Sequence, residues 1–357
     1  MTTSENALCA AFATRLVEWQ KQHGRHDLPW QNTRDPYRIW LSEIMLQQTQ
    51  VSAVIPYYER FLRSFPILQA LAESPLEHVM QLWSGLGYYS RARNLHRCAQ
   101  VIVEQHGGAF PRDVEAIAQL PGIGRSTASA IAAFAFGTAL PILEGNVKRV
   151  LARHTAIDGY PGDPKVERKL WGIALDRMPQ VDVEAYTQGM MDLGATICTR
   201  SRPACMLCPV SADCVALATH RVDVLPMPRP KRVLPQRAVT MLLLTRQETV
   251  LVERRPPSGI WGGLWSLPEL PDSIDAERYC ATRFDAQIAM GRPLPAIEHG
   301  FTHYHLTITP QPCAVMSQGS RVEEPGLMWL PLMEARGAAL PAPVKQLLMR
   351  MSETPLL

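Results

Sequence analysis

Apolar residues recur every three or four positions over most of the first 220 residues. This interval places them on one face of an α-helix. The clearest sets are Phe12, Leu16 and Trp19, then Val51, Ile55 and Tyr58, and then Val147, Val150, Leu151 and Ile157. The pattern predicts an all-α domain of about ten helices over residues 1–221.

The pattern changes at residues 222–236, where four prolines alternate with Arg229, Lys231 and Arg232. Proline at this density excludes helix and central strand, so we expect a basic, semi-rigid linker. Residues 238–245 and 249–253 are apolar or β-branched runs separated by a short polar turn, which predicts a hairpin. A further strand is expected at 304–308, with helices near 274–284 and 344–351. Residues 237–357 are therefore predicted to form a smaller α+β domain.

Composition agrees with a folded two-domain protein. The chain has 357 residues, of which 46% are hydrophobic and 19% charged, whereas disordered chains are poorer in apolar residues. The longest apolar run, 128–143, is interrupted by Gly137 and Pro141 and is too short to cross a bilayer. The first ten residues show no secretory signal. We therefore expect a cytoplasmic protein in a reducing environment, nucleoid-associated if bacterial, with no membrane partner.

The net charge of +3 does not by itself indicate a nucleic-acid partner, but its distribution is uneven. No acidic residue occurs between Glu77 and Glu104, where Arg91 lies close to Tyr88 along with two other arginines. Basic and aromatic side chains together suit contact with phosphates. An ordinary solvated helix face is the alternative interpretation.

Four of the eight cysteines fall within one short segment near the end of the helical region. In a reducing compartment such a cluster indicates a metal centre and not disulfides. The spacing by itself leaves zinc and iron–sulfur ligation open. The candidate ligands are Cys198, Cys205, Cys208 and Cys214.

The stretch Leu120–Gly124 contains two glycines, Gly122 and Gly124, between an amphipathic segment and the start of a new helix. Glycines at this spacing allow a tight turn that directs the unpaired N–H groups of the following helix toward an anion. A phosphate of a nucleic-acid backbone is the expected ligand. The stretch looks like a helix-hairpin-helix element.

Two carboxylates are candidates for acid–base chemistry. Glu43 lies in a helix predicted over 37–50, and three of its four helical neighbours are apolar. Burial would raise its pKa, which suits a general acid, although a surface glutamate is the alternative. Glu144 precedes a helix that Asn146 is expected to cap, so a stabilising role at the helix terminus competes with a catalytic one.

These motifs together resemble the MutY adenine DNA glycosylase family. The resemblance rests on residues 41–50, 85–89, the hairpin, the Gly145–Arg149 run and the four cysteines, and it extends from about Trp19 to Gly326. It implies a helix-hairpin-helix glycosylase domain with a [4Fe-4S] cluster, followed by a C-terminal domain of Nudix-like fold. It also implies base excision repair of adenine mispaired with 8-oxoguanine or guanine in double-stranded DNA, by base flipping and N-glycosidic hydrolysis. We expect a monomer.

The resemblance also assigns roles to residues. Glu43 would protonate the flipped adenine, while Glu144 and Asn146 would complete the catalytic group. Tyr88 would wedge into the base stack. The expected DNA contacts are Gln47, Gln48, Tyr88, Arg91, Gly122, Gly124, Ser126, Lys148, Arg149, Gln188 and Arg200. The expected lesion-recognition residues are Phe301, Thr302 and His303.

The chain departs from the family pattern at Glu144, where the family places aspartate, so we expect an attenuated rate. Thr302 stands where the family more often has serine. The C-terminal domain lacks the acidic helix of Nudix hydrolases, which disfavours a pyrophosphohydrolase. An endonuclease III-like glycosylase with lyase activity is disfavoured because Ser126 stands where those enzymes carry lysine, and serine cannot form a Schiff base. A catalytically weak mismatch-binding protein remains an alternative.

Overall fold

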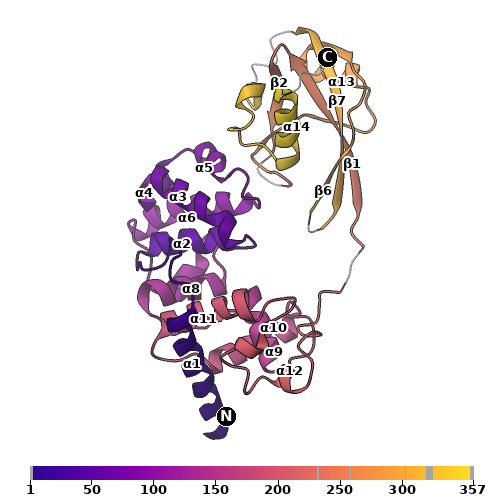
Figure 1. Cartoon of the computed structure of the whole chain (residues 1–357). Helices are drawn as coiled ribbons and strands as arrows, with labels where there is room; N and C mark the ends of the chain where they lie inside the picture. Colours follow the sequence, from indigo (N-terminus) through magenta and orange to yellow (C-terminus); the bar gives the residue numbers. More distant parts are fainter. Residues whose placement is uncertain (1–2, 231–232, 257–258, 302, 319–324, 354–357) are drawn as a thin grey trace. The chain divides into compact units, whose positions relative to one another are not determined.

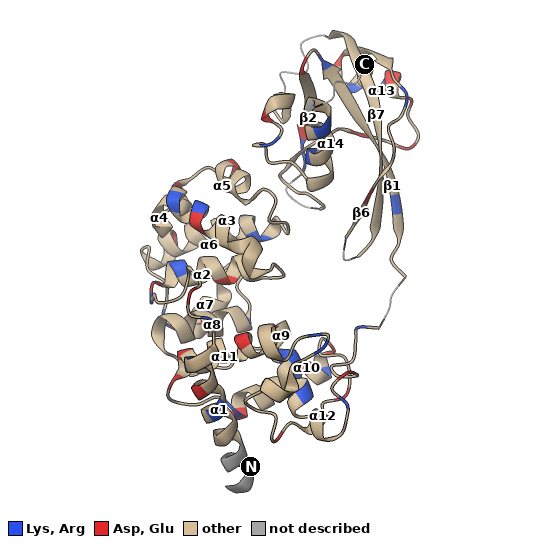
Figure 2. Ribbon diagram, in the orientation of Figure 1, with Lys and Arg blue, Asp and Glu red and all other residues tan. Residues whose placement is uncertain are grey.

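The computed structural model describes residues 3–230, 233–256, 259–301, 303–318 and 325–353. The chain forms two compact units. The first comprises Met1–Ser74 and Asn94–Lys231, and the second comprises Pro75–Arg93 and Arg232–Leu357. Lys and Arg are mixed with Asp and Glu over the helices of the first unit (Figure 2), in keeping with the small net charge.

The first part of the chain is helical, as predicted (Figure 1). Up to residue 221 the described residues contain twelve α-helices, against about ten expected. They are α1 (Thr3–His23), α2 (Pro36–Leu46), α3 (Val51–Ser64), α4 (Leu68–Glu73), α5 (Leu76–Trp83), α6 (Ser90–His106), α7 (Val114–Gln119), α8 (Arg125–Phe136), α9 (Gly145–His154), α10 (Pro164–Asp176), α11 (Val183–Asp192) and α12 (Val215–Ala218).

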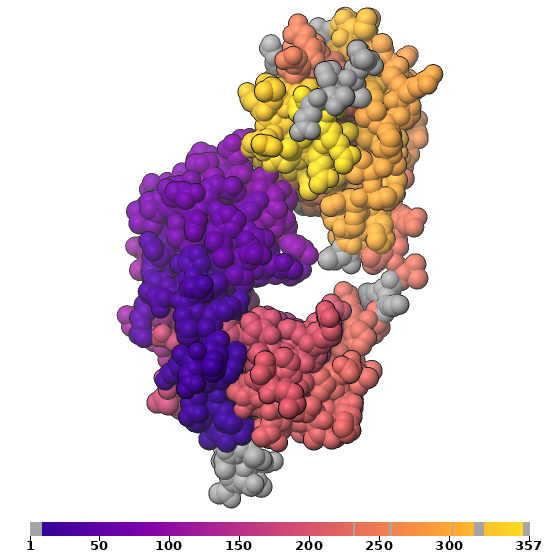
Figure 3. All heavy atoms as spheres, viewed as in Figure 1, coloured from indigo at the N-terminus to yellow at the C-terminus, as the bar shows by residue number. Residues whose placement is uncertain are grey.

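The core of the first unit joins helices that are distant in the sequence. Phe12 and Leu16 of α1 are fully buried with Leu151 of α9 and Met190 of α11 in one apolar cluster. Figure 3 shows the indigo first helix lying beside the pink residues of the later helices, and α1 packs against α11. Burial of such side chains supplies the main stabilisation of the unit.

Two details of the helical pattern were predicted wrongly. The helix that carries Glu43 ends at Leu46 and not at Gln50. Residues 47–49 form a turn in which Gln48 has a positive φ of 57°, a conformation that a helix does not permit. Ile157 lies beyond α9, which ends at His154, and only packs against the core from the following loop.

The second unit contains an eight-stranded sheet with the order β3-β2-β1-β7-β5. Strand β4 also pairs with β1, β6 with β7, and β8 with β2. The strands are β1 (Gln236–Arg246), β2 (Thr249–Arg254), β3 (Trp265–Ser266), β4 (Glu269–Leu270), β5 (Ala286–Met290), β6 (Ile297–Gly300), β7 (His305–Gln318) and β8 (Leu327–Pro331). In the described residues after 236, two α-helices accompany them, α13 (Ala276–Phe284) and α14 (Ala342–Glu353).

The predicted hairpin is confirmed, because β1 and β2 pair antiparallel with Thr245 opposite Val250. The strand expected at 304–308 is the beginning of β7, which pairs in parallel with β1. Leu242, Leu251 and Phe284 are among the buried residues that join the sheet to α13. The fold class is therefore confirmed, and no helix of the described chain is both long and apolar enough to span a membrane.

Residues 75–93 associate with the C-terminal part of the chain. The indole nitrogen of Trp265 donates to Glu77 Oε1 at 2.9 Å, and Lys345 Nζ donates to Ser84 Oγ at 2.9 Å. The second unit therefore includes α5 and the loop that follows it, although the pattern of apolar residues assigns both to the helical domain.

Candidate active site

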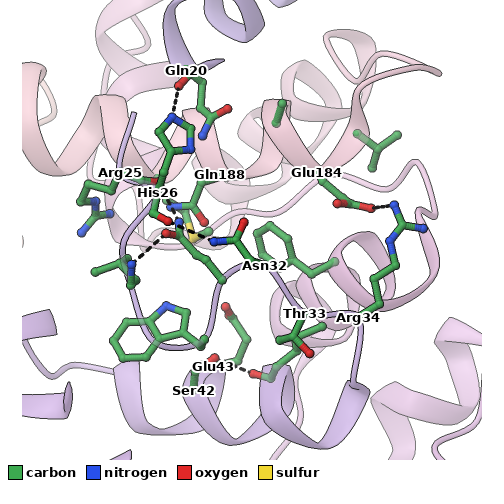
Figure 4. A pocket seen from close by; sticks show the side chains of 18 of the residues that line it. Gln20, Arg25, His26, Asn32, Thr33, Arg34, Ser42, Glu43, Glu184 and Gln188 are labelled. Atoms are coloured by element: carbon green, nitrogen blue, oxygen red, sulfur yellow. Dashed lines mark hydrogen bonds and ion pairs between the residues drawn. The ribbon is translucent and has the colours of Figure 1, made fainter. Parts of the chain in front are cut away.

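A pocket of about 720 Å³ opens in the first unit. Its walls come from α1, the segment of residues 25–34, α2 and α11, and polar side chains are frequent among them (Figure 4). Glu43 projects into it from α2, and Gln188 lines it from α11. The volume lies in the range of small-molecule sites. Two residues predicted from the sequence are thus brought together in one cavity.

Local sequence explains the position of Glu43. Asp35 caps α2 by accepting a hydrogen bond from Tyr37 N at 2.9 Å, and Pro36 occupies the first helical turn, where proline is tolerated. Trp40 is fully buried one turn before Glu43. With the apolar face of α2 turned into the core, the carboxyl of Glu43 stays partly exposed and faces the pocket.

The environment of Glu43 raises its pKa to about 7, first by burial and then by the charge of Glu144. Desolvation disfavours the carboxylate, and a second negative charge nearby disfavours it further. At neutral pH a substantial fraction of Glu43 is therefore protonated. A carboxylic acid with this pKa, open to a cavity, can donate a proton to a bound ligand.

Glu144 is itself the N-cap of α9, so the expectation that Asn146 caps this helix is wrong. The two carboxylate oxygens of Glu144 accept hydrogen bonds from Asn146 N and Val147 N, both at 2.9 Å. Burial raises the pKa of Glu144, while these two backbone bonds and Arg149 act in the opposite direction. The carboxylate is held rigidly at a helix N-terminus, where negative charge is favoured.

Asn146 and Arg149 connect α9 with the segment that leads to the cysteines. Arg149 Nη2 donates to Asn146 Oδ1 at 2.8 Å and to Gly194 O at 2.6 Å, and its Nε donates to Cys198 O at 2.7 Å. A Cβ on Gly194 would lie only 2.5 Å from Asn146 Cβ, so this close approach requires glycine. The Arg149 side chain, predicted to contact DNA, thus binds groups of the protein itself.

The sequence interpretation overlooked Asp192, which supports one wall of the pocket. Its carboxylate is completely buried and accepts from Arg25 N at 2.9 Å, Arg25 Nε at 2.8 Å and Gln188 Nε2 at 2.8 Å. Buried charges occur where they are paired in this way. No local spacing in the sequence marks Asp192, because its partner Arg25 lies 167 residues away along the chain.

The hairpin has the geometry expected of a turn between α7 and α8. Gly122 has a φ of 78°, and a Cβ there would lie 2.7 Å from Asn94 Cβ. Gly124 is the N-cap of α8 and offers no side-chain acceptor to the first N–H groups of that helix. Ser126 Oγ accepts from Leu143 N at 2.9 Å, and Gln47 Nε2 lies 3.4 Å from Thr127 Oγ1. The hydroxyl of Ser126 thus bonds to the residue just before Glu144. The hydroxyl of Thr127 bonds to the turn that follows the helix of Glu43.

Three other residues of the first unit that were predicted to contact DNA lie in different local environments. Gln48 is exposed at the turn after α2. Lys148 Nζ forms an ion pair with Glu167 Oε1 at 2.8 Å. Arg200 is exposed, and its carbonyl accepts from Arg153 Nη2 at 3.2 Å.

In the second unit, Tyr88 lies in an exposed loop with backbone strain. Tyr88 has a φ of 48° and is 46% exposed, although its ring is large and apolar. Positive φ at a non-glycine residue is uncommon and is often found at functional sites. Arg91, by contrast, is buried. Its guanidinium lies 5.5 Å from the Tyr88 ring centroid and donates to the carbonyls of Leu86 and Gly87.

The four cysteines lie in a loop region rich in hydrogen bonds. The charge of Cys198 contributes to a raised pKa at Cys205, Cys208 and Cys214, after burial, so the four thiols are within electrostatic range of one another. Arg153 Nη1 also donates to Cys198 Sγ at 3.4 Å. Among the described residues no group of three or more His, Cys, Asp or Glu side chains is already arranged around a metal position. The donor set of four neighbouring thiols nevertheless suits an iron–sulfur cluster.

Aromatic rings surround Phe301, the first of the predicted lesion-recognition residues. Phe301 lies 4.7 Å from His299, 5.6 Å from Trp261 and 4.8 Å from Tyr304, measured between ring centroids. His303 is exposed, and Thr302 lies outside the described residues. Trp261 is buried with a φ of 54°. The sequence interpretation missed two of these residues. Trp261 is distant from Phe301 in the sequence, and His299 is close to Phe301 but belongs to no motif.

Comparison with known proteins agrees with both units. Residues 41–174 match the HhH-GPD superfamily of base excision DNA repair proteins, and residues 239–350 match the NUDIX domain. An adenine DNA glycosylase of Buchnera aphidicola subsp. Acyrthosiphon pisum is 36% identical over 339 residues, which cover 94% of this chain and 96% of the relative. The human adenine DNA glycosylase is 34% identical over 399 residues, covering 94% and 73% respectively.

Solved structures resemble the helical part. A thermostable thymine-DNA glycosylase superposes with a TM-score of 0.55 at 28% identity, covering 60% of this chain and 98% of that one. An endonuclease III in complex with DNA gives a TM-score of 0.52 at 21% identity, covering 62% and 99%, and shares the fold. Together with the paired sequence domains and the nearly full-length relatives, these similarities show that the chain belongs to the adenine DNA glycosylase family.

Proposed function

We propose that this glycosylase removes adenine mispaired with 8-oxoguanine or guanine, and that it does so by hydrolysis without lyase activity. The observation that supports this most directly is Glu43, an acid with a pKa of about 7 in a polar pocket of suitable volume. A base inside a duplex cannot reach such a pocket, so the adenine has to be flipped out of the stack.

In this mechanism Glu43 donates its proton to the flipped adenine. The N-glycosidic bond breaks, its electron pair leaves with the protonated base, and the sugar develops oxocarbenium character. Water then adds to the sugar carbon, and the proton that it loses returns to the Glu43 carboxylate. Glu144 faces this positive charge as a carboxylate, positioned by its two backbone hydrogen bonds. One carboxyl thus acts as acid and the other as anion, a division known from glycoside chemistry. Asn146 supports the pair through its contact with Arg149.

The residue at position 126 supports our inference that the enzyme has no lyase activity. A lyase needs an amine that attacks the sugar carbon and forms a Schiff base. Here that position carries Ser126, whose hydroxyl accepts from Leu143 N. The product should therefore be an intact abasic site.

DNA binding and lesion recognition are divided between the parts of the chain. We assign residues 1–221 to base excision, 222–236 to a linker and 237–357 to recognition. The hairpin at Gly122 and Gly124 would bind phosphate through the free N–H groups of α8. The remaining proposed direct DNA contacts are Gln47, Gln48, Tyr88, Ser126, Lys148, Gln188 and Arg200. Arg91 and Arg149 donate to backbone carbonyls of the chain, so we propose that these two arginines act on DNA binding by positioning their segments. Phe301, Thr302 and His303 would recognise the oxidised base. We also propose that the enzyme works as a monomer and is located in the cytoplasm.

The cofactor we propose is a [4Fe-4S] cluster held by Cys198, Cys205, Cys208 and Cys214. Such a cluster would supply structural cross-linking of the cysteine loop. Arg153 would help to orient it, because this side chain donates to Cys198 Sγ and its carbonyl lies 3.8 Å from Cys214 Sγ.

The test is single-turnover cleavage of a duplex with adenine opposite 8-oxoguanine, measured beside affinity for the same duplex. The wild-type chain should release adenine and leave an abasic site that breaks only after alkali, without a borohydride-trapped complex. Glu43→Gln should bind the duplex but not cleave it. Glu59→Gln, which alters an exposed glutamate of α3, is the matched control and should cleave normally. Binding without release of adenine by the wild type would favour a mismatch-binding protein instead.

A further inference from the structure

The loop of residues 84–89, which we call the Tyr88 loop, is stabilised on one side by its own neighbours. Trp83 Nε1 donates to Gly87 O at 3.0 Å, and Arg91 Nη2 donates to Leu86 O at 3.3 Å and to Gly87 O at 3.2 Å. Gly85 and Gly87 have positive φ values of 100° and 76°. These bonds define the bend of the loop, but they do not hold it against any other part of the chain.

The C-terminal segment supplies contacts on another side of the Tyr88 loop. Lys345 Nζ, on α14, donates to Ser84 Oγ at 2.9 Å, and Ser84 Oγ lies 3.5 Å from Ala338 O. The hydroxyl of Tyr89 accepts from Gly85 N at 3.3 Å and donates to Leu340 O at 3.4 Å. Both ends of the loop therefore bond to residues 338–345.

Two further contacts flank the loop in the sequence. Before it, Glu77 of α5 accepts from Trp265 Nε1 at 2.9 Å. After it, the guanidinium of Arg93 donates to Gly262 O. Tyr88, to which the family resemblance assigns the role of a wedge, is thus carried on a segment that is bonded to the C-terminal part of the second unit at several points, while its own side chain stays exposed.

We propose that residues 338–345 position the Tyr88 loop for insertion into DNA, with Lys345 as the principal positioning residue. This inference rests on the proposed role of Tyr88 as a wedge. A side chain that wedges between bases has to stay in place while the bases are unstacked. The backbone that carries the wedge must therefore be held in a fixed position by the protein. The C-terminal part would then promote base flipping as well as recognise the lesion.

The experiment measures base flipping separately from cleavage. A duplex carries 2-aminopurine next to the target adenine, and its fluorescence rise on mixing with the full-length protein reports unstacking. Lys345→Met should slow or reduce this rise about fivefold, as expected for loss of one charge-assisted hydrogen bond. Arg350→Met is the matched control, since it removes the same charge from an exposed position of α14 and should leave the signal unchanged.

A double-mutant cycle makes the test specific for the contact. Ser84→Ala should cause a loss similar to that of Lys345→Met, and the double variant should lose little more than either single one. Lys345→Arg should restore part of the signal. Additive effects, or a Lys345→Met variant that matches Arg350→Met, would overturn the proposal. The melting temperature of each variant shows whether it folds. If Lys345→Met does not fold, the comparison of Lys345→Arg with the wild type tests the proposal instead.

The outcome is separable from that of the proposed function. If the wild type does not excise adenine, the proposed function fails, whereas the fluorescence comparison still reports on the loop. If the wild type excises adenine and the Lys345 variants flip it normally, only the present inference fails.

Discussion

Glu144 raises the pKa of Glu43, although the two carboxyls belong to different helical segments of the first unit. Glu144 itself is fixed by hydrogen bonds to Asn146 N and Val147 N. The pair therefore combines a mobile proton on one carboxyl with an immobilised charge on the other. This asymmetry leads to the first three predictions.

The cleavage rate should depend on the protonation of Glu43. A general acid is active when protonated, so the single-turnover rate should be highest below pH 7 and fall about tenfold per pH unit well above it. The measurement is the rate of adenine release between pH 5.5 and 9 at saturating enzyme. A flat profile across this range would show that Glu43 does not donate the proton in the rate-limiting step.

Folding stability should follow the same ionisation. The pKa of Glu43 is raised in the folded state from 4.5 to about 7, so its favourable contribution is present below pH 4.5 and is lost as pH rises through 7. Replacement by glutamine removes this loss. Glu43→Gln should therefore exceed the wild type in free energy of unfolding at pH 8 by on the order of 2 kcal/mol. Urea unfolding at pH 5 and pH 8 checks this, and an equal difference at both values would contradict the assignment.

Glu144 should limit the rate through its length. Displacing a charge-stabilising group by about 1 Å can cost on the order of a hundredfold in rate. Glu144→Asp should therefore raise the single-turnover rate with little change in affinity, and Glu144→Gln should lower it. If aspartate is neutral or slower, the site is adapted to glutamate and the attenuation idea is wrong. If glutamine is also neutral, capping of α9 is the only role of this side chain.

The rings around Phe301 should determine selectivity and not the chemical step. Phe301→Ala and Trp261→Leu are expected to reduce the preference for 8-oxoguanine over guanine opposite adenine by about tenfold, since Trp261 supports Phe301. Trp261→Phe should retain most of it. The readout is the ratio of affinities and of single-turnover rates for the two duplexes. An unchanged ratio would mean that this cluster does not recognise the lesion.

The protein should contain iron and not zinc. Protein purified without oxygen is expected to be brown, with broad visible absorption and about four irons per chain. Cys198→Ser should diminish both the colour and the iron content. Stoichiometric zinc without iron would reject the cluster.

Local sequence was sufficient for much of the architecture. The β1–β2 hairpin, α13 and α14 were predicted from short-range alternation and helical spacing, because these patterns depend on neighbours a few residues away. The motifs around Glu43, Gly122 and the cysteines also identified the family, since their residue types and order are specific in combination. The end of α2 was misjudged because Gln47 and Gln48 are good helix formers, and the turn at Gln48 is set by its surroundings.

Tertiary structure decided the properties that depend on distant segments. The raised pKa of Glu43 arises from desolvation by several helices and from Glu144, neither of which a local pattern contains. Asp192 became visible as a support of the pocket only when Arg25 and Gln188 converged on it. Likewise, the bond between Lys345 and Ser84 joins positions with no common motif. Burial and hydrogen bonding across the fold are collective, so they follow from packing and not from spacing along the chain.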